Sequence, residues 1–320
     1  MTAPAAKSAY LGWLAAALAG KPAHCADAVA ASNDVVMGYA TGYDAADVAP
    51  FVRSLRAVFD GPVVLVVDQN PELLAFLAEN RIEAVAPEAA GVWSPHAVVA
   101  RFAAFDRLLS ERPEARNVLL TDVRDVVFQA APFEPRPQGL EFFDEHADGV
   151  LGDHAFNMKY LRGVGGDAVA RALADKACIC VGTVMGPRAA MIRFCRTLLM
   201  LAAVPRSEIG GAFGADQAAC NMAVHLGLIE GEIVPNYGRV ATLGLTRGDA
   251  LSMVDGRIVN PDGGVSPIVH QHDRHADLAL AMHARWGGGL EHRERRRPKT
   301  LAERRRKLRD SVMRRLPELR

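Results

Sequence analysis

Short runs of predominantly apolar, often β-branched residues alternate with amphipathic segments through the first third of the chain. Each run is too short for a helix and is typical of a strand buried on both faces. The runs are residues 35–40, 62–67, 82–85 and 117–120. The segments between these runs have helical periodicity. We expect helices at 45–59, from Asn70-Pro71 onward, and at 95–110, where Ser94 would cap the first turn. This order predicts an α/β fold in which a mixed, mainly parallel sheet is flanked by helices.

The alternation becomes less regular after residue 133, and the chain divides into three predicted parts. Further strands are expected at 139–143, 179–185 and 267–270, helices at 188–203 and 216–226, and a hairpin at 253–259 that turns on Asp255-Gly256. The predicted parts are an N-terminal lead-in helix within 1–33, one catalytic domain over 34–291, and a basic helical tail over 292–320.

The formal net charge of the chain is zero, but the tail is strongly basic and the rest of the chain is acidic. Residues 292–320 hold 13 Lys/Arg and four Asp/Glu, a net charge of +9, whereas the remaining residues hold 24 basic and 33 acidic groups, a net charge of −9. Five aliphatic residues form one apolar seam in the tail: Leu301, Leu308, Val312, Leu316 and Leu319. The pattern predicts a basic interfacial helix on anionic lipid, with a solvated or self-associating helix as the alternative. Nucleic acid is disfavoured, because the tail lacks aromatic residues and the body is acidic.

The N-terminal segment and the cysteines bear on location. Lys7 followed by the apolar run 9–20 has the outline of a signal peptide, but Trp13 interrupts it and Tyr10 and Leu14 fall at helical spacing. No stretch of the chain is long and apolar enough to span a bilayer. The five cysteines are odd in number and scattered, unlike a secreted disulfide framework. We therefore expect a cytoplasmic protein, peripheral on the inner face of the membrane if the tail binds lipid.

Two carboxylates follow the strand predicted at 117–120. Asp122 and Asp125 lie in the run TDVRD (121–125), with Arg124 between them. Ligands of open parallel sheets bind at the carboxyl ends of strands, and carboxylate oxygens suit Mg²⁺ or Mn²⁺. The alternative is a turn and helix cap with Arg124 as a surface partner. No glycine-rich phosphate loop follows the first strand, which disfavours dinucleotide-binding dehydrogenases, P-loop enzymes and sugar nucleotidyltransferases.

These residues resemble a known family. The strand ending in Asp122 and Asp125 is similar to the acidic metal motif of GT-A-fold glycosyltransferases, in a D-x-x-D form. The run ADQAACN (215–221) resembles the Asp-Gln-x-x-x-Asn helix start of glycosyltransferase family 8 and its relatives, and the strand ending in His270 resembles the late strand that completes their metal site. Arg101 resembles a basic donor-binding position. The resemblance covers residues 34 to 285.

The resemblance implies a GT-A-like fold and a metal-dependent transfer of sugar from a nucleotide-diphosphate donor to a hydroxyl on a saccharide or lipid-linked acceptor. Cell-surface polysaccharide or glycolipid synthesis is the expected setting, with retention at the anomeric carbon favoured. The implied roles are Mn²⁺ or Mg²⁺ ligands for Asp122, Asp125 and His270, a nucleoside pocket for Tyr39, Ala40 and Thr41, donor binding for Arg101, Arg124 and Arg274, and catalysis for Asp216 and Gln217.

The chain departs from the family pattern at two places. Cys180 stands where the family has the asparagine of Asn-x-Gly, and no lysine follows His270 to hold the diphosphate, so Arg274 is the expected substitute. His272 competes with His270 as the metal ligand. A zinc cluster of His270, His272 and His275 with Asp273, and ordinary polar packing of these residues, are further alternatives. A non-catalytic sugar-nucleotide-binding or membrane-associated scaffold protein remains the alternative function.

Overall fold

Seven strands form the central sheet of the structure, a computed structural model that describes residues 3–21, 33–88, 94–202, 213–291 and 305. In order across the sheet they are β3 (Glu83–Val85), β2 (Val63–Val67), β1 (Asn33–Ala40), β4 (Ala115–Thr121), β7 (Ile179–Pro187), β6 (Glu141–Asp144) and β8 (Glu232–Val234). Neighbours are parallel from β3 to β4 and between β6 and β8, whereas β7 is antiparallel to both its neighbours. The predicted α/β fold with a mixed, mainly parallel sheet flanked by helices is therefore confirmed.

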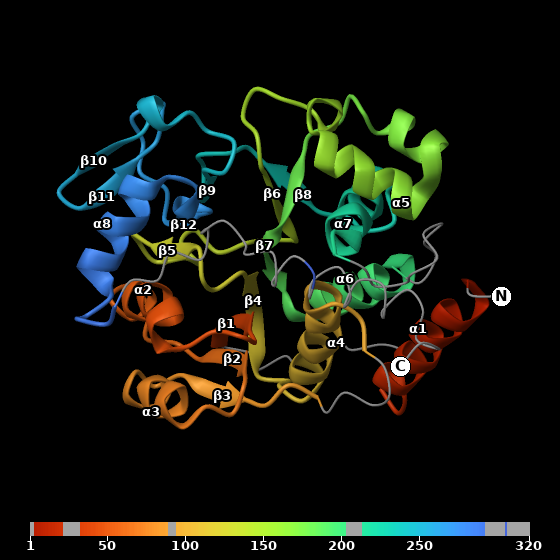
Figure 1. Ribbon diagram of the computed structural model, residues 1–320, viewed down its shortest axis with the longest axis horizontal. Helices are drawn as coiled ribbons and strands as arrows, with labels where there is room; N and C mark the ends of the chain where they lie inside the picture. The colour runs from red at the N-terminus through yellow and green to blue at the C-terminus, as the bar shows by residue number, and fades with distance from the viewer. Residues whose placement is uncertain (1–2, 22–32, 89–93, 203–212, 292–304, 306–320) are drawn as a thin grey trace.

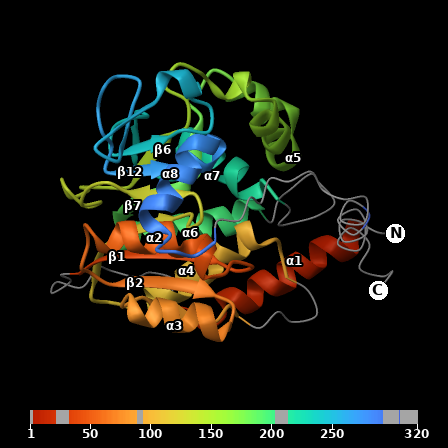
Figure 2. The ribbon, with the colours of Figure 1, turned by 60° about the vertical axis from the view of Figure 1, so that its left-hand side comes forward.

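Alternate residues along the buried strands build two cores, one on each face of the sheet. On β1, Val35 and Met37 point into the first core and Val36 points into the second, as the period of two along a strand requires. The helices of the first core are α1 (Ala3–Leu18), α4 (Ala97–Ser110), α5 (Ala155–Ala172), α6 (Arg188–Ala202) and α7 (Ala215–His225). Those of the second core are α2 (Ala45–Arg56) and α3 (Pro71–Glu79) (Figures 1 and 2).

A smaller sheet lies beside the second core. Its strands, in order, are β5 (Val126–Phe128), β12 (Ile268–His270) and β9 (Val240–Thr242), and α8 (Ala276–Trp286) packs against them (Figure 1). The hairpin of β10 (Ser252–Val254) and β11 (Arg257–Val259) and three short 3₁₀ turns complete the fold: η1 (Leu151–Asp153), η2 (Gly248–Ala250) and η3 (His272–Arg274). Because β12 pairs with β5, this sheet brings a late strand beside the segment that follows β4.

Local capping and turn predictions have mixed outcomes. Asn70 caps α3, since its Oδ1 accepts hydrogen bonds from the backbone N–H groups of Glu72 and Leu73 at 2.9 and 3.3 Å. The Asp255-Gly256 hairpin is also confirmed, with φ angles of 49° and 72°. The Ser94 cap is wrong: α4 begins at Ala97, and the ring of His96 accepts from a backbone N–H at 3.3 Å. The sequence patterns did not indicate α5, β5, β8 or β9.

Helix α1 lies in the segment expected as a lead-in helix. Tyr10 and Leu14 are buried against the first core, and the Tyr10 hydroxyl donates to the Leu199 carbonyl at 2.8 Å.

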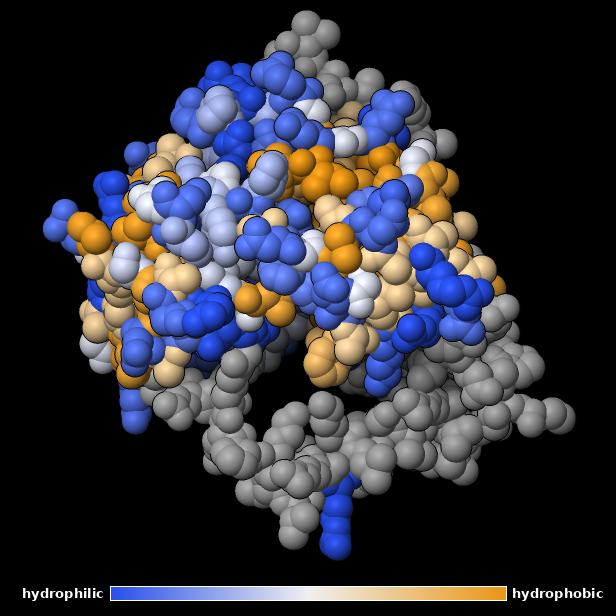
Figure 3. Space-filling model, turned by 90° about the horizontal axis from the view of Figure 1, so that it is seen from above, coloured by the Kyte–Doolittle hydropathy of each residue, from blue (hydrophilic) through white to orange (hydrophobic). Residues whose placement is uncertain are grey.

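The basic tail at 292–320 lies outside the described residues apart from Arg305, so its predicted role is not tested. Within the described part of the chain, no helix combines the length and apolarity needed to cross a bilayer. The face seen from above intersperses polar and apolar side chains (Figure 3).

Candidate metal centre

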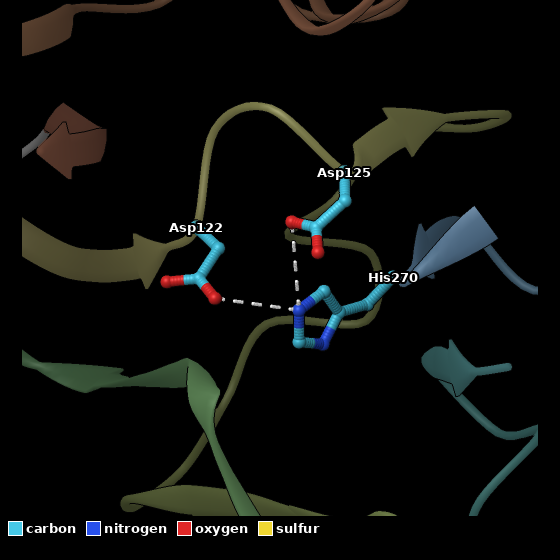
Figure 4. Close-up of side chains that lie close together, drawn as sticks. All are labelled: Asp122, Asp125 and His270. Carbon is cyan, nitrogen blue, oxygen red and sulfur yellow. Dashed lines mark ion pairs between the residues drawn. The ribbon is translucent and has the colours of Figure 1, made fainter. Parts of the chain in front are cut away.

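Three predicted ligands meet where the two sheets adjoin. Asp122 directly follows β4, Asp125 directly precedes β5, and His270 is the last residue of β12. The antiparallel pairing of β12 with β5 places His270 opposite Val126, next to Asp125. The three side chains point toward one another (Figure 4). A turn of four residues and one strand pairing thus bring together residues that lie almost 150 positions apart in sequence.

The geometry suits a small cation. His270 Nε2 lies 3.5 Å from Asp122 Oδ2 and 3.9 Å from Asp125 Oδ1, and the three ligand atoms all lie within 4.8 Å of one another. His270 is 1% exposed, and its Nε2 is a buried nitrogen without a hydrogen-bond partner. An orphaned ring nitrogen that faces two carboxylates is costly without a partner, and a cation coordinated by all three groups would supply one. The cluster could therefore hold a metal ion.

Gly182 of β7 has no side chain, and the Asp122–Asp125–His270 cluster occupies the space where one would lie. A Cβ at this position would collide with the His270 ring and would lie 2.9 Å from both His270 Nε2 and Asp122 Oδ2. The Gly182 carbonyl also accepts a hydrogen bond from the Asp122 N–H at 2.6 Å, which fixes the backbone of the first acid. The glycine of the Cys180-Val181-Gly182 run is thus needed for close approach to the metal centre.

Arg101 of α4 connects the metal centre to α7. It is 9% exposed, and its guanidinium forms ion pairs with Asp122 and, at 3.0 Å, with Asp216. Burial disfavours its charged form, but these two carboxylates outweigh burial and raise the pKa of Arg101. The structure thus places Arg101, Asp122 and Asp216, all predicted site residues, in one buried network.

The acid–base properties of the cluster show how strongly it attracts positive charge. Burial favours neutral Asp122, but the Arg101 guanidinium and His270 lower its pKa below the usual value. Burial raises the pKa of Asp125, and the Asp122 carboxylate adds to this shift against the opposing effect of His270. Burial alone would lower the pKa of His270, yet both carboxylates raise it. The two acids thus shift in opposite directions, and positive charge on Arg101 and His270 favours the ionised form of Asp122.

Gln217 and Asp216 lie at the start of α7 in different surroundings. Asp216 is 6% exposed, and burial raises its pKa although Arg101 opposes this. Gln217 bridges the backbone on either side of Cys180: it accepts from the Val181 N–H at 3.0 Å and donates to the Ile179 carbonyl at 2.7 Å. Both polar atoms of the Gln217 amide therefore hydrogen-bond to the backbone of β7. Asp216 is instead connected to Asp122 by Arg101, which forms an ion pair with each of them.

The other two predicted donor-binding arginines share one acid. Arg124 forms an ion pair with Asp273 at 2.8 Å, and Arg274 lies 3.4 Å from the other oxygen of the same carboxylate. Asp273 belongs to η3, directly after β12, so Arg124 ties the turn that carries both metal acids to the segment that follows His270. Both guanidinium groups are therefore already paired with the Asp273 carboxylate.

The residues predicted to line a nucleoside pocket lie at the carboxyl end of β1. Tyr39 and Ala40 end this strand and Thr41 follows it; the strand pairs in parallel with β4, and Gly38 stands opposite Thr121. Burial raises the pKa of the Tyr39 phenol, and its hydroxyl interacts with Thr41. These residues and the metal acids therefore lie at the same edge of the sheet, which is where open parallel sheets bind ligands.

Some neighbours of the site escape prediction from the sequence. Cys180 Sγ lies 3.7 Å from His270 Nδ1, and Glu145 Oε2 accepts from Gln217 Nε2 at 3.4 Å. Gln271, next to the metal ligand, has a φ of 59°, an unusual backbone conformation for a residue other than glycine. The position of Glu145 after a predicted strand was the only available signal, because the other contacts depend on the pairing of distant strands.

Of the two candidate histidine ligands, His270 is the one that lies beside the two acids. Within the described ranges, the cluster of potential ligands contains His270 with the two acids and does not include His272. His275 contacts the Leu243 carbonyl at 2.8 Å through its Nε2, so the three histidines do not form the alternative zinc cluster. Comparison with models of known protein families and with curated protein sequences finds no match for this chain.

Proposed function

We propose that this protein is a metal-dependent glycosyltransferase with a GT-A-like fold, which moves a sugar from a nucleotide-diphosphate donor to a hydroxyl acceptor. The observation that carries the proposal is the buried Asp122–Asp125–His270 cluster, in which one imidazole nitrogen lies 3.5 and 3.9 Å from the oxygens of two carboxylates. Its position after the central parallel strand β4 is the expected place for a ligand of this fold class.

The donor set favours Mn²⁺ or Mg²⁺ as the resident ion. Two carboxylates favour hard cations, and the imidazole shifts the preference toward Mn²⁺. A bound divalent ion would neutralise the charge that develops on a departing nucleoside diphosphate. Arg124 and Arg274 would add positive charge on the η3 side, and Tyr39, Ala40 and Thr41 would hold the nucleoside at the neighbouring strand end.

Asp216 is the proposed catalytic carboxylate. Its ion pair with Arg101, which also pairs with Asp122, holds it in a fixed place relative to the metal acids. A raised pKa makes Asp216 a stronger base than an exposed aspartate, which suits acceptance of a proton from an acceptor hydroxyl. The amide of Gln217 would act mainly by fixing the start of α7 against β7, next to the sugar.

A thermal-shift screen of nucleotide sugars with and without Mn²⁺ tests the proposal. A donor at 100 times its dissociation constant stabilises the folded chain by about 2.7 kcal/mol, which raises Tm by a few degrees. We expect a metal-dependent shift for one donor that is lost in Asp125→Ala. The matched control is Asp249→Ala, whose carboxylate is 65% exposed and pairs only locally with Arg247.

Two outcomes would contradict the proposal. A folded wild-type chain that responds to no donor in the presence of Mn²⁺ would favour a scaffold protein. A shift that is retained in Asp125→Ala would place the donor away from the metal centre. For a donor that does bind, release of nucleoside diphosphate in the presence of sugar acceptors then measures transfer itself.

A further inference from the structure

A pocket lies against strand β5, and its lining includes neither Asp122 nor Asp125. Its walls come from four separate elements: the end of α2, strand β5, the β10–β11 hairpin and α8. Figure 1 shows where these elements lie in the fold. The cavity has a volume of about 210 Å³. None of the residues predicted from the sequence to form the metal centre lines it, and the proposed function leaves it without a role.

Apolar side chains form a large part of the wall of this pocket. Phe128 and Val127 of β5 and Met282 of α8 are each at most 2% exposed, and Ala57, Val58 and Trp286 complete the apolar part. Ligand sites in proteins are mostly apolar concavities that contain a few placed polar groups. The volume suffices for a phosphate group and the first carbons of an apolar substituent, and the rest of a larger substituent would lie outside the cavity.

Two arginines supply the charge at this pocket. Arg257 of the hairpin and Arg285 of α8 both line it, and within the described ranges neither guanidinium forms an ion pair with an acidic side chain. Arg285 is held in place because Nη1 donates to the Asp255 carbonyl at 3.1 Å and the guanidinium lies 5.0 Å from the centre of the Trp286 ring. Gly256, which lacks a Cβ, makes room for it at the turn.

The remaining polar side chain of the pocket is already satisfied. Gln129 donates to the carbonyls of Ile258 and Ser266, each at 3.1 Å, and accepts from the Ile258 N–H at 2.6 Å. The polar side chains left to recognise a ligand are therefore the two arginines. A guanidinium group binds phosphate oxygens through two parallel N–H donors.

We propose that this cavity, the Arg257–Arg285 pocket, binds a phosphate ester that carries an apolar substituent. The phosphate contacts both guanidinium groups, and the substituent packs against Phe128, Met282 and Trp286. Val254 lies opposite Arg257 in the hairpin and is 56% exposed, so apolar surface continues beyond the charged rim. Such an ester occurs as the head of an anionic lipid or as a soluble metabolite, and both sources share this chemistry.

Titration calorimetry on the full chain tests the proposal with short-chain probes. We expect dihexanoyl phosphatidic acid to bind, and inorganic phosphate and dihexanoyl phosphatidylcholine to bind at least tenfold more weakly. The double variant Arg257→Ala/Arg285→Ala should lose at least tenfold in affinity. Ala57→Trp, which fills the pocket from an exposed position on its wall, should lose binding without removing a charge.

Matched controls separate this proposal from the metal centre and from simple charge effects. Arg247→Ala removes a guanidinium that is 82% exposed, and Asp125→Ala removes a metal ligand; both should bind the probe as the wild type does. Inorganic phosphate that binds as tightly as the ester, or unchanged binding in the double arginine variant, would overturn the proposal. Co-sedimentation with phosphatidylcholine vesicles that contain phosphatidic acid distinguishes the two sources of the ester. Sedimentation that is weaker for the double arginine variant but not for Arg247→Ala identifies a lipid. Sedimentation that is the same for the wild type and the double arginine variant, while the wild type still binds the soluble probe, identifies a soluble metabolite.

Discussion

The bare α-carbon of Gly182 faces the imidazole of His270, and a methyl group at this position would lie 2.9 Å from His270 Nε2. Strand β7 and strand β12 belong to different sheets, so this contact sets the separation between the sheets at the metal centre. The glycine therefore has a role in ligand placement that its neighbours on the strand cannot fulfil.

We expect Gly182→Ala to weaken Mn²⁺ binding while the fold persists. Overpacking costs about 1–3 kcal/mol, equivalent to about a five- to 150-fold loss of affinity if the imidazole moves to relieve the clash. Titration calorimetry with Mn²⁺ measures this loss. Gly163→Ala on α5 is the matched control, since a Cβ there meets nothing within 4 Å. Equal metal affinity in both variants would contradict the role assigned to Gly182.

His270 and His272 are expected to differ in their effect on metal binding. His270→Gln removes a nitrogen that faces both carboxylates and should lower Mn²⁺ affinity by at least tenfold, whereas His272→Gln should change it by less than threefold. Electron paramagnetic resonance of free Mn²⁺ reports both affinities. A larger loss for His272→Gln would show that the metal occupies another place.

Removal of Arg101 should destabilise the protein strongly. Arg101→Met keeps the apolar stem but leaves Asp122 and Asp216 without their shared cation, and breaking a buried pair costs about 3–5 kcal/mol. Urea unfolding measures this free energy. Arg247→Ala, which breaks an exposed pair with Asp249, should leave the urea midpoint almost unchanged. Similar midpoints for the two variants would refute the buried network.

Much of the parallel half of the sheet is predictable because its signals are local. The apolar run of β2 and the Asn70 cap need only neighbouring residues to be recognised. Helix α5 escaped prediction because its glycines weaken the helical pattern, and Gly166 breaks the helix with a φ of 82°. The three-residue strands β5 and β9 are defined by pairing with β12, which no local pattern records.

The candidate metal site also has some features that the local sequence indicates and others that depend on tertiary contacts. The acids after β4 are visible from the strand that precedes them, and the resemblance to glycosyltransferases drew attention to His270. The choice of His270 over His272, the space above Gly182 and the Arg101 bridge depend on the contact between two sheets. Such contacts follow from tertiary packing, so sequence periodicity cannot indicate them.

Alkaline pH should destabilise the protein through its buried thiols. Burial raises the pKa of Cys178, Cys180, Cys195 and Cys220 above the usual thiol value. The folded state therefore keeps these protons after the unfolded chain begins to lose them, near pH 8.5. Their stabilising contribution is complete below that pH and falls above it, by up to about 1.4 kcal/mol per pH unit for each thiol.

Urea unfolding at pH 7.5, 8.5 and 9.5 measures this decline. Cys220→Ala removes one of the four thiols, so its stability should fall less steeply between pH 8.5 and 9.5 than that of the wild type. The comparison of slopes cancels the constant cost of the small cavity that the substitution leaves. Parallel slopes for the two proteins would show that the Cys220 thiol does not contribute.

The amide of Gln217 supports a final prediction, because its donor and acceptor atoms have different partners. Gln217→Glu would replace the Nε2 donor by an oxygen that faces the Ile179 carbonyl, at a separation of 2.7 Å in the wild type, and the Glu145 carboxylate at 3.4 Å. Losing the donor and placing like charges together should cost about 1–3 kcal/mol of stability at neutral pH. The cost should shrink as the pH falls toward 4 and the new carboxyl group takes up a proton that it can donate. Gln138→Glu, at an exposed position, is the matched control and should leave the urea midpoint almost unchanged. A Gln217→Glu protein as stable as this control would mean that the amide does not hold α7 against β7.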